Sequence, residues 1–206
     1  QDLMHSATST SELLLGDLAE ARLVRGGAAV RVLIGGLGLG YTLKSVLARA
    51  KPDAVVEVAE LMPEVVEWNR TFMAGLNGRL LDDPRVVVRM GDVVDVIARA
   101  RPGSYDALLL DVDNGPTPMV RAGNVRLYGD RGLQALKAAL KPEGRLAIWS
   151  AAPDRSFEAR LRAAGFTASA VPARLHATAK RSAYMIYVGD KPAAGENRSV
   201  REPGRR

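Results

Sequence analysis

Residues Val32 to Thr42 read VLIGGLGLGYT, an apolar strand that runs straight into four glycines, Gly35, Gly36, Gly38 and Gly40. Such a loop lets the chain turn sharply from a strand into a helix whose free N–H groups face a ligand. Twenty residues past Gly40, a second apolar strand ends at Glu60, whose carboxylate can accept hydrogen bonds from a ribose. The pairing predicts a nucleotide-type cofactor site on a doubly wound α/β fold.

The rest of the chain continues this alternation of strands and helices. We expect strands at residues 30–34, 54–59, 85–90, 105–110 and 145–150, and a closing antiparallel pair at 166–172 and 182–188. We expect helices between them at 39–50, 63–73, 93–100, 129–140 and 154–164. The order predicts a mostly parallel seven-stranded sheet with helices on both faces.

Three segments follow from this pattern. Residues 29–189 form the single Rossmann-like domain, and residues 1–28 form a helical extension with one helix at 9–24. Ser9 and Glu12 have the spacing of a capping box at the start of that helix. Residues 190–206 are polar and rich in Pro and Gly, which predicts a disordered tail.

Composition excludes several classes of protein. The 206 residues contain no cysteine, which excludes disulfides, thiolate metal sites and a cysteine nucleophile, and we expect no metal. No apolar run approaches the roughly 18 residues of a membrane span, and no secretory signal is visible, so we expect a cytoplasmic protein. The net charge of +6 comes from 29 Lys and Arg residues against 23 Asp and Glu residues. Arginine outnumbers lysine 23 to 6 and no dense basic run is present, so the charge does not favour nucleic-acid binding.

Ligands of open α/β sheets bind at the carboxyl ends of the strands. After Glu60, the third strand is followed by Gly91 and Asp92, and the fourth by Asp111, Asp113 and Asn114. A carboxylate at the end of a buried strand is costly unless it is paired or used, which makes Asp111 the candidate catalytic residue. His5 and His176 lie outside this constellation.

Five stretches carry a resemblance to a known family: VLIGGLGLGYTLKSVL, VVEVAELMPEVVEWNR, DDPRVVVRMGD, YDALLLDVDNGP and LYGDRGL. In this order they resemble the spermidine synthase-like (polyamine aminopropyltransferase-like) branch of the class I S-adenosylmethionine-dependent methyltransferase superfamily. The resemblance implies that Glu60 holds the ribose hydroxyls, that Asp92 faces the adenine and that Asp111 deprotonates or orients the attacking amine. It assigns Leu61, Gly91 and Val93, with the four glycines, to the cofactor.

Two departures from the family bear on the chemistry. Aminopropyltransferases carry an Asp inside the glycine loop that holds the amine of decarboxylated S-adenosylmethionine, and this loop contains no acid. The family's second acid after the fourth strand falls on Asn114, with Asp113 shifted by one position. We therefore favour methyl transfer from S-adenosylmethionine to a small-molecule or peptide acceptor, with Tyr41, Asp113, Asn114 and Tyr128 as acceptor-side candidates.

Other functions remain open at this stage. The first is aminopropyl transfer from decarboxylated S-adenosylmethionine to a polyamine, which would need an acid from elsewhere, such as Glu12 or Asp17 of the first helix. The second is a catalytically silent binding or assembly protein, in which helix 9–24 packs against a partner or a second copy, as in a homodimer. A nicotinamide dehydrogenase is the weakest, because no acid or base for hydride transfer is evident.

Overall fold

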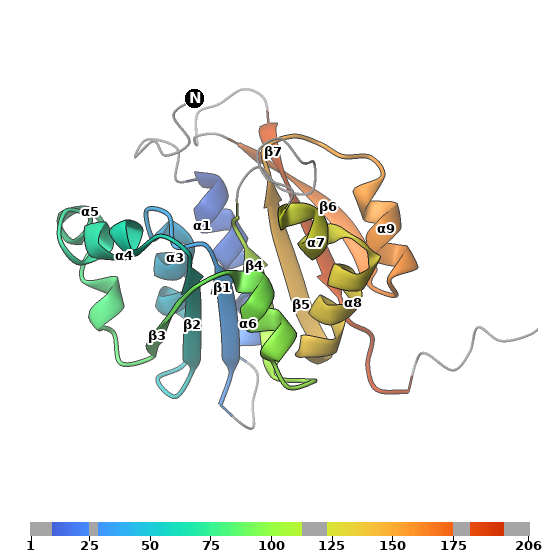
Figure 1. Cartoon of the computed structure of the whole chain (residues 1–206), viewed down its shortest axis with the longest axis horizontal. Coiled ribbons are helices and arrows are strands. Elements are labelled where there is room, and N and C mark those ends of the chain that lie inside the picture. Colours follow the sequence, from blue (N-terminus) through green and yellow to red (C-terminus); the bar gives the residue numbers. More distant parts are fainter. Residues whose placement is uncertain (1–9, 25–28, 113–122, 175–181, 196–206) are drawn as a thin grey trace, which may run out of the picture.

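The structure is a computed structural model that describes residues 10–24, 29–112, 123–174 and 182–195. A central twisted sheet runs across the molecule, with helices packed on both of its faces (Figure 1). This α/β architecture confirms the predicted fold class.

Within the described residues the sheet has seven strands in the order β3-β2-β1-β4-β5-β7-β6. The strands are β1 (Arg31–Gly35), β2 (Val55–Glu60), β3 (Val86–Met90), β4 (Tyr105–Leu110), β5 (Leu140–Ser150), β6 (Thr167–Arg174) and β7 (Ser182–Asp190). The first five strands pair in parallel, whereas β7 is antiparallel to both β5 and β6. The predicted closing pair is therefore confirmed, with β7 inserted between β5 and β6.

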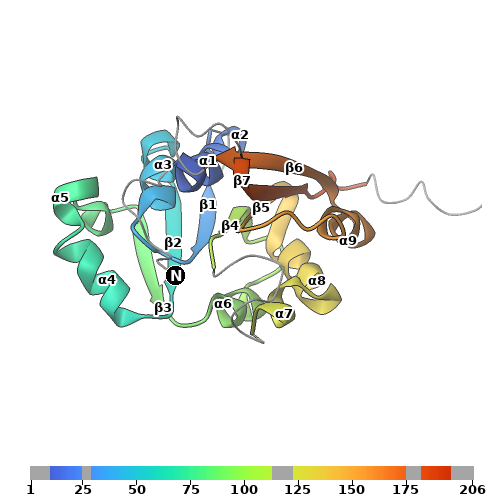
Figure 2. The ribbon, with the colours of Figure 1, turned by 90° about the horizontal axis from the view of Figure 1, so that it is seen from above.

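The helices divide between the two faces of the sheet. They are α1 (Thr10–Asp17), α2 (Glu20–Leu23), α3 (Tyr41–Arg49), α4 (Pro63–Arg70), α5 (Ala74–Asn77), the 3₁₀ helix η1 (Leu80–Asp82), α6 (Val93–Arg99), α7 (Gly123–Tyr128), α8 (Asp130–Ala139) and α9 (Phe157–Ala163). Seen from above, α1, α2 and α3 lie on one side of the sheet, and α6, α7, α8 and α9 on the other (Figure 2).

Burial of both sheet faces explains the near-continuous apolar strands. Val32 and Ile34 of β1 belong to the core beneath α1 and α3, whereas Leu33 belongs to the core beneath α6 and α8. Leu108 and Leu109 of β4 divide in the same way, because successive side chains of a strand point to opposite faces. A parallel sheet covered on both faces therefore needs apolar residues at most positions.

The N-terminal segment differs from the single helix expected at 9–24. It forms two short helices, and the chain tightens between them where the Ala19 N–H donates to the Gly16 carbonyl at 3.1 Å. Contacts with α3 hold the end of α1: a Cβ on Gly16 would lie 2.6 Å from the Cβ of Ser45, and the Ser45 hydroxyl donates to Asp17. This close helix–helix packing overrides the continuous helical pattern.

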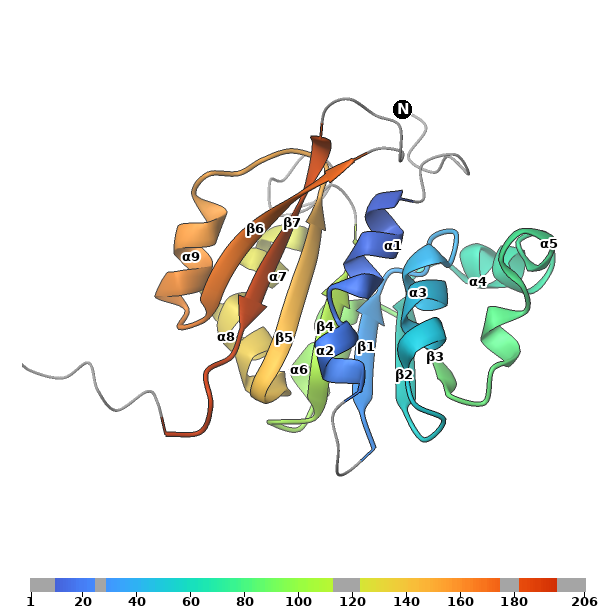
Figure 3. The same cartoon turned by 180° about the vertical axis from the view of Figure 1, so that it is seen from behind.

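Figure 3 shows α1 and α2 from their own side, beside β1 and α3. Arg145 of β5 donates to the carbonyl of Leu18 at 2.8 Å and to both oxygens of the Asp190 carboxylate, and Arg22 donates to the same carboxylate at 2.9 Å. These bonds tie the N-terminal helices to the far end of the sheet. Strand β7 thus reaches Asp190, the first residue of the segment assigned to the tail. Among the described helices, none has the length and apolar character that a bilayer span requires.

One glycine of the loop after β1 is fixed by its backbone neighbours. Gly36 has a φ of +87°, and a Cβ at this position would lie 2.3 Å from the carbonyl oxygen of Asp111. Gly38 also has a positive φ, +51°, but a Cβ there would meet nothing within 4 Å. The absence of a side chain at Gly36 therefore permits the close approach of β1 to β4. At Gly38 the only requirement is the left-handed backbone angle.

These two glycines give a matched test of the close approach. Gly36→Ala should lower the free energy of unfolding by about 3 kcal/mol, because the new Cβ would both strain the left-handed backbone and clash with the Asp111 carbonyl. Gly38→Ala should lower it by only about 1 kcal/mol, because only the backbone term remains. Urea denaturation of both variants checks this, and equal losses would contradict the assigned role of Gly36.

Candidate functional site

Backbone hydrogen bonds bring four strand ends to one edge of the sheet. The Gly36 N–H donates to the Ala59 carbonyl at 2.9 Å, and the Asp111 N–H donates to the Gly35 carbonyl at 2.8 Å. The Gly91 N–H donates to the Glu60 carbonyl at 2.9 Å. The glycine loop, Glu60, Gly91 and Asp111 therefore lie together at the carboxyl edge, as the sequence predicts.

Glu60 is the residue that organises this edge. Its side chain is buried, with 7% exposed, and one carboxylate oxygen accepts the Leu37 N–H of the glycine loop at 2.8 Å. The other oxygen accepts the Met62 N–H at 2.9 Å. A carboxylate has about four acceptor positions, so two remain after these bonds. Glu60 can therefore hold the loop and still accept two hydroxyl groups.

Two buried amides brace the glycine loop from outside. Asn69 of α4 donates to the Gly38 carbonyl at 2.9 Å, and Asn77 of α5 donates to the Leu39 carbonyl at 2.6 Å. Sequence reasoning missed both residues, and Asn77 ends α5, which lies beyond the helix expected at residues 63–73. The only available signal was an asparagine within an otherwise helical pattern, since Asn competes with the backbone for hydrogen bonds.

Apolar side chains surround the ends of β2 and β3. Leu61, Met62 and Met90 are about half exposed, at 51%, 47% and 53%. Asp92 is exposed and caps α6, where its carboxylate accepts the Val94 N–H at 2.8 Å. Val93 is instead buried beneath Gly35, where its methyl groups occupy the space that a Cβ would need. The surface around Asp92 thus offers apolar contacts and a carboxylate, as an adenine ring would require.

Asp111 carries the perturbed carboxyl group of β4. Its side chain is half-buried directly after the strand, and burial raises the pKa of the carboxyl from 3.8 to about 6. A carboxylate with a pKa near neutral pH can both accept and release a proton under working conditions. The residue therefore has the properties of a general base at the edge of the sheet.

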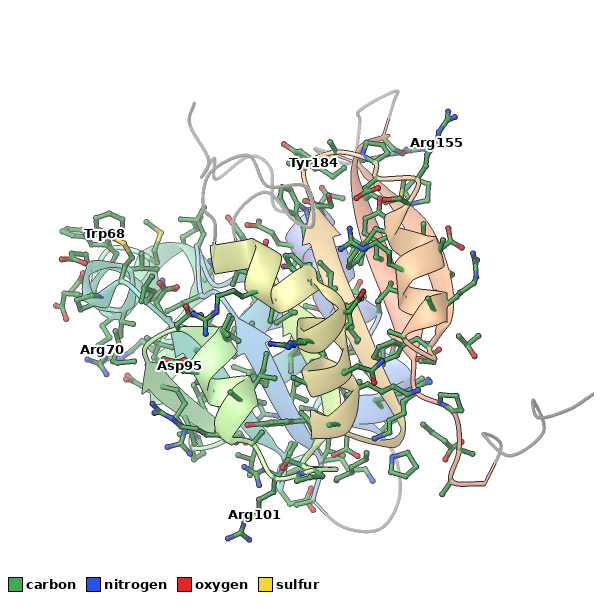
Figure 4. The ribbon with its side chains drawn as sticks, turned by 45° about the vertical axis from the view of Figure 1, so that its right-hand side comes forward. Trp68, Arg70, Asp95, Arg101, Arg155 and Tyr184 are labelled. Atoms are coloured by element: carbon green, nitrogen blue, oxygen red, sulfur yellow. The ribbon has the colours of Figure 1, made fainter. Side chains whose placement is uncertain are left out.

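A second perturbed carboxyl group, that of Glu12 on α1, is affected by the charge of Asp111. Burial, and then the negative charge of Asp111, raise the pKa of Glu12 from 4.5 to about 8. The charge of Glu12 in turn raises the pKa values of Tyr41 and Tyr184, where burial is the larger cause. The Tyr184 ring lies 4.8 Å from that of Trp149, centroid to centroid, and Tyr184 stands near the upper end of the sheet in Figure 4. The charge of Glu12 is thus coupled to one other acid, Asp111, and to two tyrosines.

The remaining candidates fall elsewhere. Tyr128 is 1% exposed and packs edge-on against Phe157, with ring centroids 5.8 Å apart, so it is a core residue rather than a surface of the site. Asp113 and Asn114 lie outside the described residues, as do His5, His176 and Ser9. The predicted capping box includes Ser9, so it also lies partly outside them. Among the described residues no group of three or more His, Cys, Asp or Glu side chains could hold a metal ion.

The chain is similar to proteins of known function. No protein-family model matches the chain. The chain is 34% identical over 153 residues to polyamine aminopropyltransferase 2 of Streptomyces coelicolor, which covers 70% of this chain. It is 30% identical over 132 residues to the polyamine aminopropyltransferase of Mycobacterium tuberculosis, which covers 63% of this chain.

The chain is a homologue of the polyamine aminopropyltransferases. It spans only 27% and 24% of the lengths of these two relatives. Putrescine N-methyltransferase 1 of Nicotiana tabacum is a third relative, 32% identical over 114 residues that cover 55% of this chain and 28% of that protein. The homologues are thus transferases, and the resemblance to the spermidine synthase-like branch is confirmed.

Solved structures confirm the fold. A spermidine synthase in complex with the transition state analogue AdoDATO has a TM-score of 0.71 and 18% identity, over 90% of this chain and 61% of that one. Human methyltransferase-like protein 13 in complex with SAH has a TM-score of 0.64 and 23% identity, over 87% of this chain and 81% of that one. The fold is therefore of the class I methyltransferase type.

The facing carboxyl groups make stability depend on pH. Between about pH 4.5 and 8 the folded protein binds a proton at Glu12 that the unfolded chain has released, so the free energy of unfolding falls as pH rises. Glu12→Gln should remove this contribution and be more stable than the parent at pH 8, on the order of 1 kcal/mol or ~2–4 °C in Tm. At pH 4 the two proteins should be nearly equal.

Urea denaturation at pH 4, 6 and 8 measures the effect. Glu20→Gln is the matched control, because Glu20 is an exposed acid of the neighbouring helix α2 and should leave the pH dependence unchanged. A Glu12→Gln protein with the same pH dependence as the parent would contradict the raised pKa.

Proposed function

We propose that the chain is a transferase domain that binds an adenosyl sulfonium donor along the carboxyl edge and passes an alkyl group to a small amine. The observation that carries this proposal is Glu60, which has two acceptor positions left at the edge of the sheet while it fixes the glycine loop. A ribose offers two neighbouring hydroxyl groups to such a carboxylate. The relatives named for polyamine and putrescine substrates support an amine as the acceptor.

The donor supplies an electrophilic carbon next to a positively charged sulfur. The amine nitrogen attacks this carbon, the carbon–sulfur bond breaks, and its electron pair stays on the sulfur of the neutral thioether product. Asp111 takes the proton that the attacking nitrogen loses, for which a pKa of about 6 is suitable. The main task of the site is to align the nucleophile, the carbon and the sulfur, and side chains on rigid strand ends hold such an alignment well.

Aminopropyl transfer from decarboxylated S-adenosylmethionine is the first candidate, and it replaces the methyl transfer that we favoured from the sequence. The names of the bacterial relatives, and the fold shared with a spermidine synthase, support it. Methyl transfer from S-adenosylmethionine stays as the second candidate. It is favoured by the glycine loop without an acid and by the tobacco putrescine N-methyltransferase relative.

A direct assay separates the two candidates. The protein is incubated with putrescine and either decarboxylated S-adenosylmethionine or S-adenosylmethionine, and the products are identified by mass spectrometry. We expect an aminopropylated product with the decarboxylated donor. A methylated product with the carboxylated donor would establish the second candidate instead. Binding of either donor without any product would show a silent protein and overturn the proposal.

Asp111→Asn tests the general base. The variant should bind methylthioadenosine, which has the adenosyl part of the donor without its amine, within about threefold of the parent affinity, since Asp111 is not at the ribose end, and lose about 100-fold or more in kcat. Asp95→Asn is the control, because Asp95 is an exposed acid on α6 (Figure 4) and should keep full activity. An Asp111→Asn protein with undiminished kcat would remove Asp111 from the mechanism.

A further inference from the structure

Glu12 has a position that the fold alone does not explain. It lies in the first turn of α1, where its own carbonyl accepts the Thr42 hydroxyl of α3 at 3.2 Å, so its backbone is fixed beside the glycine loop. Thr42 lies two residues after the glycine loop, and Gly36 in that loop packs against the Asp111 carbonyl. Glu12 and Asp111 therefore flank the same loop, and the negative charge of Asp111 acts on the Glu12 carboxyl group. An acid in the first helical turn is favoured by the helix dipole, but that effect gives no reason for it to face another acid.

Among the described residues, neither carboxyl group has a cationic partner. Within the part of the chain that the structure describes, no ion pair or side-chain hydrogen bond joins Glu12 or Asp111 to another residue, although ten other ion pairs are present there. Half-buried acids without partners are costly for a folded protein. A ligand with a positive charge would remove the cost by pairing with both.

We propose that Glu12 and Asp111 together bind the primary ammonium group of an aliphatic amine substrate at the carboxyl edge of the sheet. The inference rests on the proposed transferase function and deepens it, because it names the residue that recognises the charged end of a substrate. Glu12 supplies the acid that the glycine loop lacks. The ammonium group belongs either to the aminopropyl tail of the donor or to the amine acceptor. Both ligands carry a primary ammonium on a short aliphatic chain.

The neighbouring rings suit such a ligand. Tyr41 begins α3 directly after the glycine loop, and the charge of Glu12 acts on it and on Tyr184 of β7, whose ring packs on Trp149. The faces of aromatic rings attract cations, and Trp and Tyr attract them well. Two acids and two tyrosines from four separate parts of the chain are therefore a suitable environment for an ammonium group on an apolar chain.

The test compares Glu12→Gln with the parent protein by isothermal titration calorimetry. Three ligands are used: decarboxylated S-adenosylmethionine, methylthioadenosine, which has the same adenosyl part without the ammonium, and putrescine with methylthioadenosine present. If Glu12 binds the donor tail, the variant should bind the decarboxylated donor about tenfold or more weakly, since a hydrogen bond to a charged group is lost. If Glu12 binds the acceptor, the affinity of the variant for putrescine should fall by that factor instead. In both cases methylthioadenosine should bind equally well.

Proton release gives a readout that a merely structural role would not move. At pH 7 much of the Glu12 carboxyl is protonated, and pairing with an ammonium should expel up to about one proton. Titrations in two buffers of different ionisation enthalpy measure this number, which should be smaller for Glu12→Gln. Glu20→Gln, an exposed acid on α2, is the matched control and should behave like the parent.

The outcomes separate this inference from the function on which it rests. If the parent binds methylthioadenosine, and Glu12→Gln changes neither amine affinity nor proton release, the ammonium site is wrong and the transferase proposal stands. If Glu12→Gln lowers the affinity for methylthioadenosine as much as the affinity for the amines, Glu12 has only a structural role. If the parent binds no adenosyl ligand at all, the proposed function itself fails.

Discussion

The hydrogen bond from the Leu37 N–H to the buried Glu60 carboxylate is the interaction on which the candidate site depends. It joins the end of β2 to the turn after β1, and the same carboxylate also fixes the chain at Met62. An ionised carboxylate that accepts backbone N–H groups forms a strong, short-range constraint. Without it the glycine loop would lose the anchor that defines where a ligand can approach the sheet.

The other parts of the edge follow from the parallel register. Because β1 pairs with both β2 and β4, residues Gly35, Ala59 and Leu110 end at one level, and whatever follows them in sequence must share the same edge. Gly36 permits the closest contact between β1 and β4, and the amides of Asn69 and Asn77 hold the outer side of the loop. The fold thus supplies a rigid frame, and the chemistry depends on a few side chains placed on it.

The sequence predicted the sheet and its carboxyl edge because both depend on local signals. Apolar runs, glycines that follow a strand and acids at strand ends are visible without knowledge of contacts, which is why Glu60 and Asp111 could be placed. Asn69 and Asn77 were missed because their role is to donate to a loop more than 30 residues away. The core packing of Tyr128 could not be predicted for the same reason, since only the packing of α7 against α9 shows that its ring meets Phe157. Glu12 could be named only as one of two possible acids until α1 was placed beside Asp111.

A crystal structure with methylthioadenosine or decarboxylated S-adenosylmethionine bound tests the central claim most directly. The account predicts both ribose oxygens within about 2.5–3.0 Å of the Glu60 carboxylate, with the Leu37 N–H bond kept and the sulfur directed toward Asp111. A ligand whose ribose lies away from Glu60, or that binds outside the carboxyl edge of the sheet, would contradict it.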